Sequence, residues 1–302
     1  MRGKGIRNFQ PGDEAAVVAV LNEAFQGLEA FSLQGLGALV SSSSFNADGF
    51  FLAERDGLVQ GCIGVMNLAR ENAFELRYLA VRDALKNRTT ADELVRRALE
   101  YVESRGPEYL KANTLAIEPY VEVFKGFGFK PVRRILRIAW DLTHEMRLLN
   151  TDSQIEELTE PMVTDAVRTY CEGLTPYWDW WTEESGGHEA VLRVGEQLIR
   201  RDLSNWIVAK VGGKIAGISG VISNPATKEA RFCGVIVLPE FRHRRLGSAL
   251  MRKAIEKAKR QGQERLVVFT FASLDSLAPG AILYLKSGGK IEAEYLHLEK
   301  PI

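Results

Sequence analysis

The alternation of apolar and polar residues predicts helices and strands in an order that occurs twice along the chain. In the first half, the apolar runs on either side of Asp56-Gly57 read as two strands joined as a hairpin. The expected strands of this half are residues 5–9, 50–55, 58–68, 74–81, 109–117 and 132–142, and the expected helices are 11–25, 89–106 and 118–129.

The second half repeats this plan. It predicts helices over 159–174, 187–203, 278–289 and from Gly247 onward, a hairpin over 205–223 that turns at Gly212-Gly213, and strands over 229–239, 265–272 and 290–300. Val81 corresponds to Val237 and Gly128 to Gly288, at offsets of 156 and 160 residues. Nearly constant offsets indicate an internal duplication. We therefore expect two α/β domains, residues 1–148 and 149–302, each with a mixed sheet flanked by helices.

Composition excludes several classes of protein. The 302 residues carry a formal net charge of zero, so no global field attracts nucleic acid or a membrane surface. Apolar runs stay far below the roughly 18 residues that span a bilayer, and the first residues lack the apolar core of a signal peptide. Three cysteines without CxxC spacing and four scattered histidines favour neither a disulfide framework nor a metal site. We expect a cytoplasmic protein that binds no metal.

A cluster of cations precedes the helix that begins near Gly247. Arg242, His243, Arg244 and Arg245 stand there, and no acid occurs between Glu240 and Glu256. A helix N-terminus already carries about half a positive charge and free backbone N–H groups, so a bound diphosphate would offset the repulsion. Gly247 would let a phosphate approach the backbone, and the Ser248 hydroxyl would add a donor. The alternative is a solvated basic turn.

The corresponding turn of the first half differs in charge. It contains no glycine, and we expect Asp92 and Glu93 to lie in the first turn of its helix, where they would neutralise the helix dipole. Only the second turn is therefore predicted to hold an anion.

The pattern Val237-x-Pro239-x-x-Arg242-x-x-x-x-Gly247-x-Ala249 resembles the acetyl-CoA motif of the GNAT superfamily of N-acyltransferases. The resemblance implies two tandem GNAT-like domains, with acetyl-CoA as co-substrate and the CoA pyrophosphate bound by the backbone of this turn. Arg245 replaces the first glycine of the family pattern, and Lys86, Thr89 and Ala91 make the first-half copy degenerate. The expected cofactor-binding residues are Val235, Ile236, Val237, Arg242, His243, Arg244, Arg245, Leu246, Gly247 and Ser248.

The resemblance also implies a tyrosine that protonates the departing CoA sulfur, and Tyr284, four residues before Gly288, matches that position. Gly289 stands where the family has phenylalanine. The first repeat carries Phe124 at the equivalent place, which has no proton to give. The alternative for Tyr284 is a packed core aromatic.

The general base is less well marked. Residues of the strand 229–237 alternate in direction, and Glu229 is the candidate base, although it could equally pair with Arg231. Cys233 is a possible nucleophile or a buried thiol. Three tryptophans lie within residues 174–189, beside Asp179, Glu183 and Glu184. They could bind a cationic amine or fill the interface between the repeats.

The sequence thus predicts an N-acetyltransferase that moves an acetyl group to a primary amine of a small molecule or peptide, by direct attack, in the C-terminal repeat. The alternative is a non-catalytic acyl-CoA sensor. Nucleic-acid binding through residues 242–245 is disfavoured because no wider basic stripe exists. The acceptor, the acyl length and the oligomeric state stay open.

Overall fold

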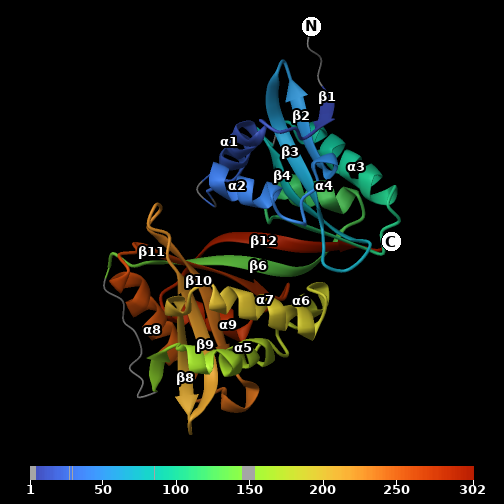
Figure 1. Ribbon diagram of the computed structural model, residues 1–302. Coiled ribbons are helices and arrows are strands. Elements are labelled where there is room, and N and C mark those ends of the chain that lie inside the picture. Colours follow the sequence, from blue (N-terminus) through green and yellow to red (C-terminus); the bar gives the residue numbers. More distant parts are fainter. Residues whose placement is uncertain (1–4, 27, 29, 85, 145–153) are drawn as a thin grey trace. The chain divides into compact units, whose positions relative to one another are not determined.

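The computed structural model describes residues 5–26, 28, 30–84, 86–144 and 154–302, and these form two compact units (Figure 1). Unit 1 comprises the chain up to Ile135 together with Ala293–Ile302, and unit 2 comprises Leu136–Glu292. The predicted domain boundary between residues 148 and 149 lies outside the described residues. No helix of the described ranges is long and apolar enough to cross a membrane.

Unit 1 follows the predicted order of elements, with one additional short helix. Its elements are β1 (Gly5–Asn8), α1 (Glu14–Ala24), α2 (Leu33–Val40), β2 (Phe50–Arg55), β3 (Leu58–Asn67), β4 (Ala73–Val81), α3 (Arg88–Glu103), β5 (Tyr109–Leu115), α4 (Glu118–Gly126) and the first part of β6 (Lys130–Asp141). The sequence did not predict α2.

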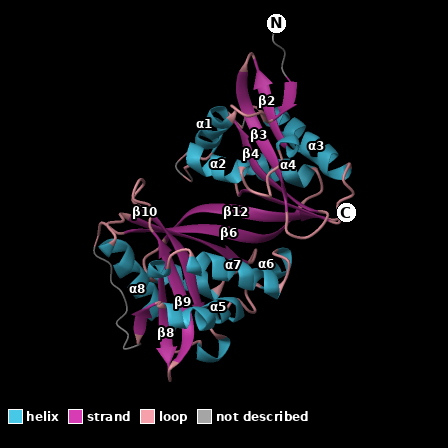
Figure 2. Cartoon of the chain, in the orientation of Figure 1, coloured by secondary structure: helices cyan, strands magenta, loops and turns pink. Residues whose placement is uncertain are grey.

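Unit 2 begins within β6 and ends within β12 (Lys290–Lys300). Between them lie β7 (Ile155–Glu157), α5 (Val163–Glu172), α6 (Asp179–Glu184), α7 (His188–Arg200), β8 (Trp206–Val211), β9 (Lys214–Ile222), β10 (Glu229–Val237), α8 (Leu246–Arg260), β11 (Arg265–Ala272) and α9 (Pro279–Lys286). Figure 2 shows the strands and helices in these positions.

Each unit is built on a mostly antiparallel sheet with one parallel pair. The strand order is β1-β2-β3-β4-β5-β12 in unit 1 and β6-β11-β10-β9-β8-β7 in unit 2, and the parallel pairs are β4–β5 and β10–β11. The repeats therefore exchange their last strands. The C-terminal strand β12 pairs with β5, with Tyr295 opposite Leu115, whereas the end of β6 lies beside β11. The predicted fold class, two α/β domains with mixed sheets flanked by helices, is confirmed.

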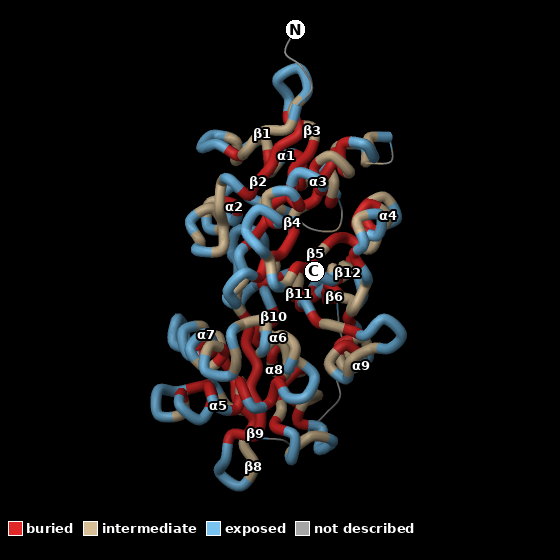
Figure 3. The backbone as a smooth tube through the Cα atoms, turned by 90° about the vertical axis from the view of Figure 1, so that its right-hand side faces the viewer, coloured by how far each residue is buried: buried red, intermediate tan, exposed pale blue. Residues whose placement is uncertain are grey.

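Two-residue alternation along the strands divides the core of unit 2 into two layers. Ile207 and Ala209 of β8 pack in the cluster that includes α8, whereas Trp206 and Val208 pack in the cluster that includes α5 and α7. Helices thus cover both faces of the sheet, and Figure 3 shows the central strands as buried segments. One cluster of buried residues forms the core of unit 1.

The parallel strands of unit 2 pair only at their beginnings. The ladder between β10 and β11 contains Glu229–Arg265, Ala230–Leu266 and Arg231–Val267. A register shift between Phe232 and Val235 follows on the other side of β10, where it pairs with β9. A bulge bends and twists a strand, so the two parallel strands diverge after Arg231. This divergence opens the sheet where the candidate site lies.

Candidate active site

The divergence of β10 from β11 forms the floor of a cavity of about 590 Å³ in unit 2. The cavity is lined by the beginning of α8, including Leu246, Gly247 and Ser248, and by aromatic residues that follow α5. Val235 and Tyr284 also line it. The cavity thus brings together the turn and the tyrosine that the sequence singled out.

Gly234 forms the bulge at the centre of this floor. Its φ of +85° is a conformation that glycine adopts without strain, and its carbonyl accepts a hydrogen bond from the Ser219 hydroxyl (2.7 Å). A Cβ at this position would lie 3.1 Å from the Tyr284 hydroxyl oxygen. A side chain here would therefore crowd the proposed acid. An isolated glycine inside a strand pattern is the sequence signal for such a bulge.

Tyr284 projects from α9 to this bulge. Its hydroxyl oxygen accepts a hydrogen bond from the Val235 N–H (2.9 Å), and its ring packs edge-on against Trp140 and Phe232. Burial raises the pKa of Tyr284 to about 12. The phenol therefore keeps its proton throughout the physiological range, and Tyr284 is a packed aromatic that also lines the cavity.

The end of β10 turns part of its backbone toward the cavity. Leu238 N–H donates to the carbonyl of Ala216 on the β9 side, so the alternating residues Val235 and Val237 direct their backbone groups toward the diverging strand β11. The Val235 N–H is occupied by the Tyr284 hydroxyl, and Arg242 reaches the Val237 carbonyl. Ile236 faces the other way, packing its side chain with α5 and α7.

Helix α8 begins with free donors and without negative charge. Its N-cap is Arg245, which makes no side-chain capping bond, and no acid lies in the first turn. The first backbone N–H groups of a helix lack intrahelical acceptors, so those of Leu246, Gly247 and Ser248 are available to an anion. Arg245 has a φ of +61°, the left-handed conformation that glycine favours. Arginine thus takes the backbone conformation expected of the glycine it replaces.

Arg242 is a clamp between two loops rather than a free cation. Its Nε donates to the carbonyl of Val237 (3.0 Å), and its Nη2 donates to the carbonyls of Gly173 (3.0 Å) and Thr175 (2.6 Å). Its guanidinium also lies 5.1 Å from the ring centre of Tyr177. Arg242 therefore fixes the turn before α8 to the segment after α5.

The other cations of the turn are exposed. His243 and Arg245 line the cavity, whereas Arg244 lies over the ring of Phe241 (5.4 Å) and is not among the lining residues. Direct side-chain contact with a phosphate is therefore available to His243 and Arg245.

Glu229 lies outside the cavity lining. It accepts hydrogen bonds from Arg137 (3.0 and 3.1 Å) and Arg265 (3.0 Å), and both arginines also pair with Glu292. These two cationic partners hold the carboxylate at the start of β10. This position gives no support to the prediction that Glu229 is the general base.

Aromatic residues of the segment after α5 form part of the cavity wall. Trp178 and Trp181 line the cavity, and the Trp178 ring lies 4.9 Å from that of Phe271 and stacks on Trp180 (5.7 Å). The acids of this segment, Asp179, Glu183 and Glu184, are not among the lining residues. The tryptophans of the segment therefore contribute to the cavity, but its carboxylates do not.

The remaining titratable groups near the bulge are poor bases or nucleophiles at neutral pH. Burial raises the pKa of the Cys233 thiol to about 11 and that of Tyr170 to about 12. Both side chains line the cavity on the side of α5 and α7. Cys233 thus fits the buried-thiol interpretation better than that of a nucleophile.

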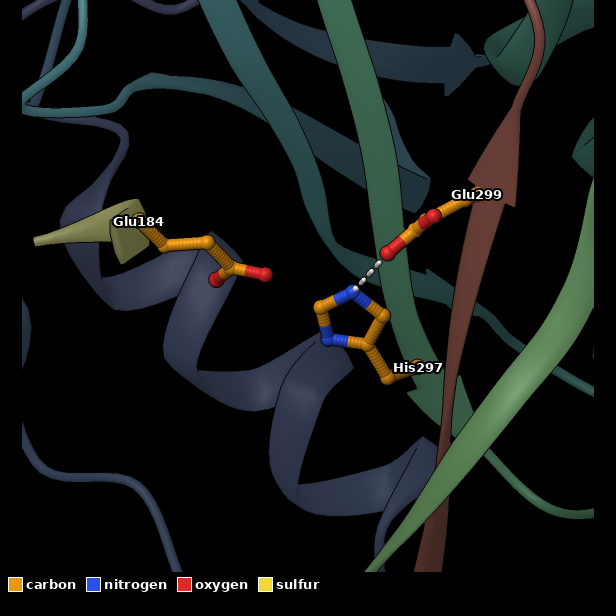
Figure 4. A group of neighbouring side chains, drawn as sticks. All are labelled: Glu184, His297 and Glu299. Atoms are coloured by element: carbon orange, nitrogen blue, oxygen red, sulfur yellow. Dashed lines mark ion pairs between the residues drawn. The ribbon is translucent and has the colours of Figure 1, made fainter. Parts of the chain in front are cut away.

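The buried histidine of unit 1 is not a second acid–base group. Burial, with Lys111 and Arg133 nearby, lowers the pKa of His297 to about 2, so its imidazole is neutral. Figure 4 shows Glu299 directed at this ring, at an Nε2–Oε1 distance of 3.5 Å.

The corresponding turn of unit 1 closes on its own side chains. Lys86 pairs with Asp83 (2.7 Å), and the Asn87 amide donates to the Arg82 carbonyl (2.8 Å). Helix α3 begins at Arg88 and has no acid in its first turn, so the expectation that Asp92 and Glu93 lie there was wrong.

Residues 168–278, which contain Tyr170, the Gly234 bulge and the turn before α8, match the model of the acetyltransferase (GNAT) family. The matched segment lies within unit 2. An uncharacterized N-acetyltransferase of Methanocaldococcus jannaschii is 36% identical over 102 residues, which are 32% of this chain. The match spans 43% of that relative.

Solved structures share the fold along nearly the whole chain. A GCN5-related N-acetyltransferase from Sphaerobacter thermophilus superimposes with a TM-score of 0.80 at 17% identity, covering 98% of this chain and 95% of its own. A tandem GNAT protein from the clavulanic acid biosynthesis pathway gives a TM-score of 0.64 at 16% identity, with 98% of both chains covered. At these identities the likeness shows the fold, which is that of tandem GNAT-like domains.

Proposed function

We propose that this protein transfers an acetyl group from acetyl-CoA to a primary amine, at a site in the GNAT domain of unit 2. The observation that carries the proposal is the cavity itself. It connects the uncapped start of α8, a site suited to a diphosphate, with the buried hydroxyl of Tyr284. A phosphate site and a proton donor in one cavity are what transfer from a CoA thioester requires.

In the proposed reaction the amine nitrogen attacks the acyl carbon directly, and the carbon–sulfur bond breaks. The departing sulfur takes the proton of Tyr284. The attacking nitrogen releases its extra proton to water, and a proton from water restores the phenol. The Val235 N–H bond to the Tyr284 oxygen stabilises the phenolate while it exists. Because the site is walled by apolar side chains, this hydrogen bond is stronger than it would be in water.

The backbone of unit 2 gives the substrate a defined path. The N–H groups of Leu246, Gly247 and Ser248 would bind the diphosphate, and Val237 would face the extended arm of the coenzyme between β10 and β11. The Gly234 bulge leaves room for the thioester beside Tyr284. Gly247 limits crowding at the start of α8, because a Cβ added there would lie 3.2 Å from Leu283.

The test is an assay of thiol release from acetyl-CoA with a panel of primary amines, together with calorimetric titration of CoA. We expect CoA binding and thiol release with at least one amine. CoA binding without thiol release from any amine would replace this proposal by the acyl-CoA sensor. Absence of CoA binding would refute both.

A further inference from the structure

The cavity has a cationic residue, Arg231, near the start of β10, and no acid among its described lining residues. Arg231 is a lining residue, and among the described lining residues none is aspartate or glutamate. Arg231 makes no ion pair with any described residue, in contrast to Arg137 and Arg265 nearby. A charged group at a cavity wall that lacks an internal partner is available to a charged ligand.

The position of Arg231 in the sheet is fixed by the strand pattern. It forms the last residue pair between β10 and β11, opposite Val267, so it lies where the two strands begin to diverge. Its neighbour Phe232 packs in the cluster of α8, so the Arg231 side chain faces α5 and α7. Tyr170 of α5, whose phenol experiences the charge of Arg231, lies on that same side.

Aromatic rings line the same cavity. Trp178 and Trp181 pack on the α5 and α7 side with their ring centres 6.4 Å apart, and Phe271 meets Trp178 edge-on. Flat apolar walls of this kind bury and orient an aromatic ring. The aromatic rings therefore favour an aromatic ligand, and Arg231 favours a ligand that also carries an anionic group.

We propose, on the basis of the function proposed above, that the acceptor is an aromatic or arylalkyl amine that also carries an anionic group, and that Arg231 pairs with this group. A polycationic acceptor would meet Arg231 without a compensating carboxylate among the described lining residues. The same cation disfavours the ammonium form of a bound amine. It would thus favour the free amine that attacks, in a cavity whose described lining holds no carboxylate base.

Three matched amines test the class. They share the benzylamine nucleophile and differ in the para substituent: 4-(aminomethyl)benzoate, benzylamine and 4-(aminomethyl)benzylamine. We expect kcat/KM to be about tenfold or more higher for the benzoate than for benzylamine, as for a charge-assisted hydrogen bond, and lowest for the diamine. In Arg231→Met the benzoate should lose this preference, and Arg231→Glu should favour the diamine. The control is Arg168→Met, an exposed arginine of α5 outside the cavity, which should keep the wild-type preference.

A binding measurement separates this inference from the catalytic proposal. Calorimetric titration with 4-methylbenzoate and with 4-methylbenzylamine, both in saturating CoA, needs no turnover. We expect the anion to bind about tenfold more tightly than the cation, and Arg231→Met to remove the difference. Acetylation of spermidine but not of the benzoate, or equal binding of the two probes, overturns the inference and leaves the acetyltransferase proposal standing. If the anion binds in an Arg231-dependent way but no amine is acetylated, the anion site is supported and the catalytic proposal is refuted.

Discussion

Equivalent bulges in the two units show how one backbone serves two purposes. Unit 1 has Tyr78 at its bulge and unit 2 has Gly234, and both have positive φ values, 59° and 85°. The bulge carbonyl is held from the neighbouring strand in both, by the Cys62 thiol (3.4 Å) in unit 1 and by the Ser219 hydroxyl (2.7 Å) in unit 2. The repeats thus retain the same geometry and differ in the side chain that it presents.

The difference extends to the tyrosine that meets each strand. In unit 1 the Val81 N–H donates to the hydroxyl of Tyr120 (3.2 Å), which lies one helical turn before the Phe124 position, and Tyr78 packs against Phe31 in the core. In unit 2 the glycine bulge leaves Tyr284 facing the cavity. Both copies therefore contain a strand N–H that donates to a tyrosine hydroxyl, from positions that do not correspond, and in unit 2 the tyrosine lines the cavity.

The largest effect expected from this comparison is on turnover. Tyr284→Phe should lower kcat by about 10³-fold, because general acid catalysis contributes on that order, while CoA affinity stays the same. Stopped assays of thiol release and CoA titration measure the two quantities. The matched change Tyr120→Phe should leave kcat unchanged and lower the free energy of unfolding by about 1 kcal/mol. A Tyr284→Phe enzyme with more than half of the wild-type kcat would contradict the role of Tyr284.

The pH profile sharpens this prediction. With a pKa raised to about 12 by burial, Tyr284 remains protonated as the pH rises to 10, so loss of the acid should not reduce kcat in that range. The raised pKa also stabilises the fold fully below pH 10, the ordinary pKa of a tyrosine, and this contribution is lost as the pH rises through about 12. If kcat of the wild type fell between pH 8 and 10 and that of Tyr284→Phe did not, the raised pKa of Tyr284 would be contradicted.

The phosphate turn gives the next largest contrast. Gly247→Glu should weaken CoA binding about 100-fold or more, because it places a carboxylate where the diphosphate would bind. Thr89→Glu adds the same charge to the first turn of α3 in unit 1 and should leave CoA affinity unchanged. Calorimetry with CoA checks both variants. Equal loss in the two variants would mean that unit 1 also binds the coenzyme.

Arg242 and Lys86 occupy matching places in the two turns but have different contacts. Arg242→Met should lower the free energy of unfolding by about 1–3 kcal/mol, because three carbonyl groups lose a charged donor. Lys86→Met removes only an exposed pair with Asp83 and should leave stability unchanged. Chemical denaturation measures both. If Arg242→Met instead weakened CoA binding without loss of stability, the arginine would contact the phosphate directly.

The smallest effect concerns backbone strain at the start of α8. Arg245→Gly should raise the free energy of unfolding by about 0.5 kcal/mol, since glycine relieves the cost of φ +61° but loses more entropy on folding. Arg245→Ala keeps the strain and should bring no gain. Thermal unfolding of the two variants distinguishes them, and a stabilisation of equal size would show that charge, not strain, is responsible.

Local signals were readable from the sequence. Alternation along the strands, the duplication and the cation-rich start of α8 each depend on neighbouring residues, and they gave the fold and the candidate turn. The roles of Arg242 and Glu229 could not be read in this way. Arg242 contacts Gly173, 69 residues earlier, and Glu229 contacts Arg137, 92 residues earlier, so only the folded chain defines them. Arg231 was seen only as a possible partner of Glu229.

The exchange of last strands was also hidden from the sequence, because the two repeats end in strands of similar pattern. Its consequence concerns how unit 2 can be isolated. A fragment of residues 149–302 would retain β12 without its partner β5 and would lack β6, leaving one edge of β11 open. Exposed strand edges pair with other chains and promote aggregation. An autonomous version of the domain should therefore be cut as residues 136–292, so that it begins with the strand borrowed from the first repeat and ends before the strand it lends.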